Sequence, residues 1–206
     1  MKKSYSSFFS KLMLSLVAIF CINMGALAAT EVHVDKAGTL STLLTTSEST
    51  LKITGSINGT DVKYLLELIK AGTVTNLDIS EVAIVKGGSA YFENYTTDDD
   101  VIGHSMFKEC KNLKTIELPA TIYSIQANAF SGSGLRKIDI PNSVSSLGGD
   151  AFAYCSSLDS VTMGRRVTSL GQGVFYASSV KFAYIKPIKY ITTSAVSVTR
   201  VSIVIP

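Results

Sequence analysis

Apolar residues recur along the second half of the chain at a nearly constant step. Phe107, Phe130, Phe152 and Phe175 follow one another at intervals of 23, 22 and 23 residues, and each lies in the same pattern of apolar and polar positions. A period in the twenties is typical of proteins that stack short repeats, because one repeat is too small to bury its own apolar face. The pattern therefore predicts a solenoid in which the phenylalanine rings stack from coil to coil.

Each repeat also predicts one short strand. In the pattern LxxIxI the three apolar side chains point inward and the residues between them point outward. Pro119 and Pro141 end two of these strands, because proline lacks the N–H that a ladder needs. A second inward pair follows in each repeat, as at Val144 and Leu147. The predicted inward strand residues are Val74, Leu77, Ile79, Leu113, Ile116, Leu118, Leu135, Ile138, Ile140, Leu158, Val161, Met163, Val180, Ala183 and Ile185.

The segment before the repeats predicts a strand and a helix. Residues 51–57 alternate between apolar and polar, as a half-buried strand does. Residues 61–71 place their apolar side chains on one helical face, with Asp61 or Thr60 as the N-cap and Gly72 at the end. A single helix before a repeat array suits an end cap, because the first coil needs cover.

Two parts of the array depart from the regular step. The strand ends at Ile79 and Leu118 lie 39 residues apart, and the excess falls at 85–100, which predicts an exposed loop inserted into one coil. At the C-terminus, residues 203–206 resemble a strand end and predict a degenerate final half coil, since end units of such arrays are atypical.

The first 28 residues predict a secretory signal peptide. Lys2, Lys3 and Lys11 form a positively charged segment before an apolar run at 12–25, and Ala-Leu-Ala at 26–28 is a typical cleavage site. A membrane anchor is disfavoured, because the apolar run is shorter than the roughly 20 residues that a span requires. We therefore expect a secreted or cell-surface protein that meets the membrane only through this peptide before cleavage.

Composition narrows the function classes. The chain has 19 basic and 16 acidic residues, and removing three lysines with the signal peptide leaves 16 of each. A neutral domain of this size has no electrostatic reason to bind nucleic acid.

Cys110 and Cys155 hold the same repeat position two coils apart, which is about 10 Å, whereas a disulfide needs Cα atoms within about 7 Å. We expect two buried free thiols.

The sequence offers little for catalysis or metal binding. Its two histidines, His33 and His104, stand in no metal-binding or catalytic motif. The run at 98–100 has three adjacent aspartates without the spacing of a calcium loop, so solvated carboxylates compete with a calcium site as its interpretation. We therefore predict no enzyme activity, no cofactor and no metal site.

The repeats resemble the BspA-like, or Treponema pallidum-type, leucine-rich repeats, whose consensus is close to IGxxAFxxCxxLxxIxIPxSVTx. Matching residues are Ala129-Phe130, Ala151-Phe152, Cys110, Cys155, Leu113, Leu135, Leu158, Ile116, Ile138, Pro119, Pro141 and Asn142-Ser143-Val144. The match is strong over 102–185, although Gly164 and Lys186 stand where the family has proline. The fold we expect is an α/β repeat: a right-handed leucine-rich-repeat solenoid of about five to six short coils with an N-terminal cap containing one helix. Its parts would be the signal peptide at 1–28, the cap at 29–73 and the solenoid at 74–206.

The resemblance also implies a function. Members of this family are typically exported and several are implicated in adhesion, so we expect a non-catalytic, adhesin-like module that binds a protein or glycoprotein of the host matrix or of another cell surface. The alternative is a structural scaffold, or a truncated repeat protein, with no ligand of its own.

The candidate binding surface is the outward face of the strand ladder. Its residues are Thr115, Glu117, Lys137, Asp139, Ser160, Thr162, Phe182 and Tyr184, with Asn76 and Asp78 on the strand before them. Phe182 and Tyr184 are candidate anchors, because aromatic residues are favoured at interfaces. They would instead be buried if residues 189–206 cover them or if the strand register slips by one. Tyr91, Phe92 and Tyr95 in the inserted loop are a second candidate, unless they pack onto the cap.

Overall fold

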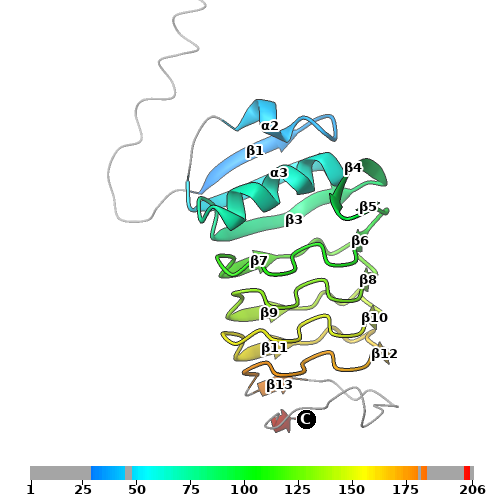
Figure 1. Ribbon diagram of the computed structural model, residues 1–206. Helices are drawn as coiled ribbons and strands as arrows, with labels where there is room; N and C mark the ends of the chain where they lie inside the picture. Colours follow the sequence, from blue (N-terminus) through cyan, green and yellow to red (C-terminus); the bar gives the residue numbers. More distant parts are fainter. Residues whose placement is uncertain (1–28, 45–47, 181, 185–201, 205–206) are drawn as a thin grey trace, which may run out of the picture.

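The protein is a stack of short coils beneath a first layer that contains its main helix (Figure 1). The computed structural model describes residues 29–44, 48–180, 182–184 and 202–204, the last two segments by their backbone only. The predicted signal peptide lies outside these residues, and so do residues 205–206 of the predicted C-terminal half coil. Among the helices of the described ranges, none is long and apolar enough to span a bilayer.

Parallel strands form the main ladder along one side of the stack. The strands are β1 (Thr30–Val34), β2 (Thr50–Ile57), β3 (Asn76–Ile84), β7 (Thr115–Glu117), β9 (Lys137–Asp139), β11 (Ser160–Thr162), β13 (Phe182–Tyr184) and β14 (Ser202–Val204). They pair in the orders β1-β2-β3-β7 and β9-β11-β13-β14. The two groups adjoin between β7 and β9, where the amide of Arg136 donates to the carbonyl of Lys114 at 3.2 Å. The ladder therefore follows the chain order, coil after coil.

A second ladder of two-residue strands forms another side. These strands are β6 (Val101–Ile102), β8 (Ser124–Ile125), β10 (Ser146–Leu147) and β12 (Ser169–Leu170). All pair in parallel in the order β12-β10-β8-β6, so Ile125 pairs with Leu147 and Leu147 with Leu170. Figure 1 shows this ladder on the right of the stack and β7 to β13 on the left. The side chains between the two ladders form the core.

The third side is built from a tight turn around each repeat phenylalanine, which we call the Phe turn. Its four rings stack with centroids 5.3, 5.2 and 5.6 Å apart and with nearly parallel planes, as the repeat predicted. In each turn the residues two before and two after the phenylalanine have positive φ: Ser105, Glu109, Asn128, Gly132, Asp150, Tyr154, Gly173 and Ala177. This backbone lets alternate amides donate to the next coil, as from Phe130 to Ala151 at 2.8 Å. The sequence did not reveal it.

The apolar columns are buried as predicted. Every predicted inward strand residue from Val74 to Val180 is buried, and so are Val144 and Leu147 of the second inward stretch. Ala183 and Ile185 lie beyond the residues whose side chains are described. Leu170 of the last described coil is only partly buried, which fits its place near the end of the stack.

Helix α3 (Gly59–Lys70) corresponds to the helix predicted at 61–71 and follows a short helix α2 (Leu40–Leu43). Its N-cap is Asn58, so the predicted cap at Asp61 or Thr60 is corrected by two or three residues. Asp61 stands one turn inside, where its buried carboxylate completes a capping box with the Asn58 amide at 2.9 Å. The same carboxylate accepts the amides of Gly38 and Leu40 and so ties the α2 segment to α3.

The inserted segment 85–100 is largely exposed, as predicted, but it folds as a β-hairpin and not as a loop without strands. Strands β4 (Gly87–Phe92) and β5 (Tyr95–Thr97) pair antiparallel. The hairpin packs closely on the start of α3, where the amide of Ser89 donates to the hydroxyl of Thr60 at 2.9 Å. A Cβ at Gly59 would lie 2.3 Å from the Ser89 carbonyl oxygen, so only glycine fits there.

Candidate functional site

The predicted binding residues on β7, β9 and β11 form three rows on the main ladder. Ser160 pairs with Lys137 and Thr162 with Asp139, while Thr115 and Glu117 of β7 pair with Asn76 and Asp78 of β3. Glu117, Lys137, Asp139 and Thr162 are exposed, whereas Thr115 and Ser160 are half-buried. The outward alternation was therefore predicted correctly along these strands.

Phe182 and Tyr184 stand on β13 at the end of these rows. The backbone of Phe182 pairs with Ser160 and that of Tyr184 with Thr162, which is the predicted register without a slip. Strand β14 continues the ladder beyond them, with Ser202 paired to Phe182. Their own side chains lie outside the described residues, and of the segment 189–206 that was considered as a cover only the backbone of 202–204 is described.

Three of the predicted residues come together in a shallow groove at the carboxyl ends of the strands, which we call the ladder groove. These three, Glu117, Asp139 and Thr162, are the last residues of their strands. The rest of the groove is lined by Leu118, Ala120, Ile140, Pro141, Asn142, Ser143, Met163, Gly164 and Arg165. Thr115, Lys137 and Ser160 lie at the other ends of the strands and do not line it.

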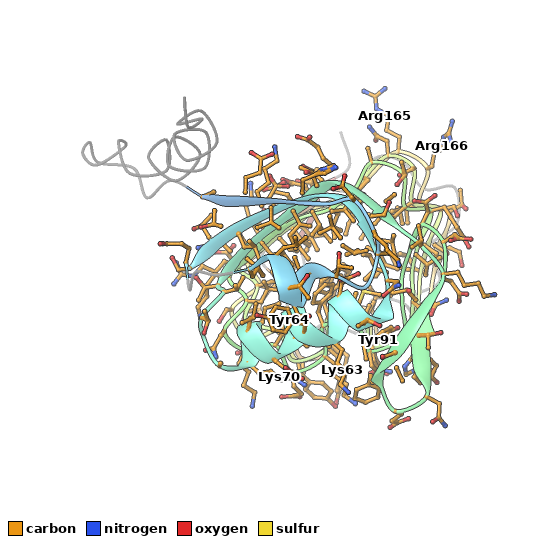
Figure 2. The ribbon with its side chains drawn as sticks, turned by 90° about the horizontal axis from the view of Figure 1, so that it is seen from above. Lys63, Tyr64, Lys70, Tyr91, Arg165 and Arg166 are labelled. Carbon is orange, nitrogen blue, oxygen red and sulfur yellow. The ribbon has the colours of Figure 1, made fainter. Side chains whose placement is uncertain are left out.

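The charges around the ladder groove are mixed. Lys137 reaches Asp139 with its ammonium 3.4 Å from the carboxylate, and both groups are exposed. The amide of Arg165 donates to the Asn142 side chain at 3.0 Å, and its own side chain is exposed. Figure 2 shows Arg165 and Arg166 on the side of the stack opposite helix α3. Two carboxylates and the guanidinium group of Arg165 thus line the groove, an arrangement suited to polar segments of a partner.

Gly164 shapes this groove where the repeat pattern has proline. A Cβ at this position would lie 2.2 Å from the carbonyl oxygen of Pro141 in the coil before it. Any side chain would therefore push the two coils apart. In this coil the departure from the family pattern therefore permits a close contact with the coil before it.

The aromatic residues of the hairpin do not form one exposed patch. Tyr91 is 8% exposed and donates its hydroxyl to the carbonyl of His104 at 3.3 Å. Burial, with the nearby Asp98 and Tyr95, raises the pKa of Tyr91 to about 12. Phe92 is partly buried, under the ammonium of Lys108 at 5.6 Å. Tyr91 is therefore buried, as the packing alternative required, although its hydroxyl contacts His104 of the first coil and not the cap; Figure 2 shows it beside α3.

Tyr95 is the exposed ring of the hairpin. It is 40% exposed and stacks on His104, with the ring centroids 4.3 Å apart and the planes 9° from parallel. His33 lies elsewhere, on β1, with its ring 2.8 Å from the Thr54 hydroxyl and 3.2 Å from the Asp35 carboxylate. The two histidines are not brought together.

The three aspartates at 98–100 each have a partner of their own. Asp98 lies 3.6 Å from the Lys86 ammonium, Asp99 accepts the Lys86 amide at 2.7 Å, and Asp100 accepts the Thr121 hydroxyl at 2.7 Å. Within the part of the chain that the structure describes, no group of three or more His, Cys, Asp or Glu side chains is arranged to hold a metal ion.

The two cysteines are buried and free, as their repeat position predicted. Burial raises the pKa of the Cys110 thiol to about 12 and also raises that of Cys155. The Cys155 thiol donates to the carbonyl of Phe130 at 3.1 Å. Both side chains fill the core as small apolar groups.

Sequence reasoning missed one surface feature. Tyr154 and Tyr176, on the Phe-turn side, are 58% and 46% exposed and meet edge to face at 5.5 Å. Their signal in the sequence was weak, because each occupies a turn position that holds unrelated residues in the other repeats.

The comparisons with known proteins agree with the repeat pattern. The model of the BspA-type leucine-rich repeat region matches residues 88–200 in six copies. A leucine-rich repeat protein from Bacteroides ovatus ATCC 8483 is 26% identical, with a TM-score of 0.42, over 58% of this chain and 33% of that one. No curated protein matches the sequence.

Two further solved structures are similar at lower identity. The leucine-rich repeat protein of T. pallidum is 20% identical, with a TM-score of 0.38, over 79% of this chain and 55% of that one. A leucine-rich cell surface protein from Faecalibacterium prausnitzii A2-165 is 17% identical, with a TM-score of 0.33, over 76% of this chain and 60% of that one. The matched part of this chain thus spans between a third and three fifths of these proteins.

Proposed function

Because the chain belongs to the BspA-type leucine-rich repeat family, we propose that it is an exported, non-catalytic module that binds a protein or glycoprotein in the manner of an adhesin. Leucine-rich repeats commonly mediate protein interactions, and their extended ladders serve as binding surfaces. The partner we propose is a component of the host matrix or of another cell surface.

The ladder groove carries this proposal. Glu117, Asp139 and Thr162 project from strands that neighbour one another in the ladder, so their side chains are held at a fixed spacing before any partner arrives. Groups placed on rigid strands lose little conformational entropy on binding. Exposed side chains of mixed charge also favour recognition of a complementary protein surface over capture of an apolar small molecule.

The finer architecture belongs to the same proposal. We take the coils to wind as a right-handed solenoid of about five to six turns, with 29–73 as the N-terminal cap and 74–206 as the solenoid. Helix α3 would then shield the first coil, because its apolar residues Val62, Leu65 and Ile69 are buried. The signal peptide at 1–28 would direct the chain to the cell surface or the medium.

The test is binding of the purified protein to a panel of host matrix glycoproteins. The variant Glu117→Gln/Asp139→Asn keeps the shape of the groove and removes both carboxylates. If they accept charge-assisted hydrogen bonds, each worth about 1.5–3 kcal/mol, affinity falls at least about tenfold. Glu67→Gln is the matched control, because Glu67 is an exposed carboxylate on helix α3.

The outcomes separate the two candidate functions. Saturable binding that falls in the groove variant and persists in Glu67→Gln supports the proposal. Binding lost only in a Phe182→Ala/Tyr184→Ala variant would move the site to the end of the ladder at β13. No binding to any member of the panel would favour the scaffold alternative.

A further inference from the structure

A second groove lies on the Phe-turn side, away from the ladder groove, and three consecutive coils build it. The coils read KECKN at 108–112, SGSGL at 131–135 and AYCSS at 153–157. In the first coil Glu109 and Lys111 project outward, and in the third Tyr154 and Ser156 hold the same two positions. The middle coil has glycine at both. We call the resulting hollow the turn groove.

The two glycines leave the floor of the turn groove without side chains, and each of them avoids a different clash. A Cβ at Gly134 would lie 1.9 Å from the carbonyl oxygen of Lys111, so the coils could not approach so closely with any other residue. Gly132 has φ +70°, and a Cβ there would lie 2.5 Å from the Glu109 carboxylate. The Glu109 side chain therefore leans over Gly132 toward the coil of Tyr154. Its carboxylate is then about one coil spacing, or about 5 Å, from that coil.

One wall of the turn groove is aromatic and the other is polar. Tyr154 lines this wall and is 58% exposed, so it offers its ring to solvent. Tyr176, which is 46% exposed and lies outside the groove lining, meets it edge to face. On the opposite wall the Glu109 carboxylate lies 3.3 Å from the Lys111 ammonium. These two charges cancel, so the groove offers both acceptors and donors without a net field for a charged ligand.

We propose that the turn groove binds a neutral pyranose sugar of a glycan. A pyranose has one face of C–H groups, which stacks on an aromatic ring, and a rim of hydroxyl groups. Neighbouring hydroxyls donate to a carboxylate and accept from an ammonium, which Glu109 and Lys111 supply side by side. A cationic ligand fits less well, because the Lys111 ammonium already pairs with the Glu109 carboxylate. This inference uses other residues than the ladder groove and does not rest on the function proposed for that surface.

The experiment screens the purified protein on an array of neutral oligosaccharides built from hexoses and N-acetylhexosamines, followed by calorimetric titration of the strongest. Tyr154→Asn removes the ring but tolerates the positive φ of 58° at this position. Gly132→Asn fills the groove at φ +70° and displaces only the flexible end of Glu109. Tyr123→Ala is the matched control, since Tyr123 is 53% exposed and does not line the turn groove.

We expect saturable, salt-insensitive binding that weakens about tenfold or more in both groove variants and is unchanged in Tyr123→Ala. Circular dichroism and thermal unfolding are used to check that each variant is folded. The proposal is overturned if no sugar binds at millimolar concentration or if both variants bind as the wild type does. It is also overturned if binding falls only in Glu117→Gln/Asp139→Asn, which would place the sugar on the ladder. That last result would leave the ladder proposal standing.

Discussion

Truncating the second ring of the phenylalanine stack tests the core of this architecture. Phe130 has no exposed surface and stacks on Phe107 at 5.3 Å and on Phe152 at 5.2 Å. Phe130→Ala removes the buried ring and leaves a cavity between two rigid coils. Such substitutions cost about 3–5 kcal/mol in the free energy of unfolding. Because coils on both sides contribute contacts, we expect a value in the upper half of that range.

A second substitution separates stacking from burial. Phe130→Leu keeps most of the apolar volume but removes two ring pairs, each worth about 0.5–1.5 kcal/mol beyond area. We therefore expect Phe130→Leu to lower the free energy of unfolding by about 1–3 kcal/mol. The assay is urea unfolding followed by far-ultraviolet circular dichroism, with the m-value as a check that the transition is unchanged. A loss below about 1 kcal/mol for Phe130→Ala would refute the assignment of this ring to a packed core.

Two further predictions follow from the backbone and from a buried phenol. Ala177 has φ 52°, and relieving that strain with Ala177→Gly recovers about 1–2 kcal/mol against about 0.5–1 kcal/mol of added unfolded-state entropy. Its urea midpoint should therefore rise, and a fall would show that the turn is not strained there. The raised pKa of Tyr91, about 12, means that the unfolded chain loses this proton first, above pH 10. The buried phenol of Tyr91 therefore contributes its full stabilisation below pH 10, and this stabilisation is lost as the pH rises toward 12. Tyr91→Phe should accordingly flatten the alkaline fall in the free energy of unfolding. An identical fall in both proteins would contradict the burial of this hydroxyl.

Periodicity was enough to predict the stacked rings and the inward columns. Leu135, Ile138 and Ile140 recur with the same spacing in each coil, and a repeat that buries the same positions every time leaves few alternative arrangements. The outward positions Lys137 and Asp139 followed from the same alternation, because neighbouring residues of a strand face opposite sides.

What the sequence did not predict depends on contacts between coils or on unusual backbone. Tyr154 and Ala177 adopt positive φ although neither type favours it, because the turn around the phenylalanine imposes it. Gly87 and Gly88 indicated a loop, whereas the pairing of Gly87 with Thr97 and of Phe92 with Tyr95 makes a hairpin. The turn groove requires three coils in register, so no single repeat reveals that Gly132 lies between Glu109 and Tyr154.

The hydrogen bonds that the described Phe-turn amides donate to a neighbouring turn run in one direction along the stack. The amide of Phe107 donates to Ala129, that of Phe130 to Ala151 and that of Phe152 to Val174, in each case from a coil to its successor. A turn therefore completes its bonding only after the next 22 or so residues have been synthesised. On the ribosome, each emerging coil would close the one before it, and growth of the folded stack would follow translation. A chain cut at a repeat boundary would end in a turn whose amide donors lack the carbonyl acceptors of the missing coil.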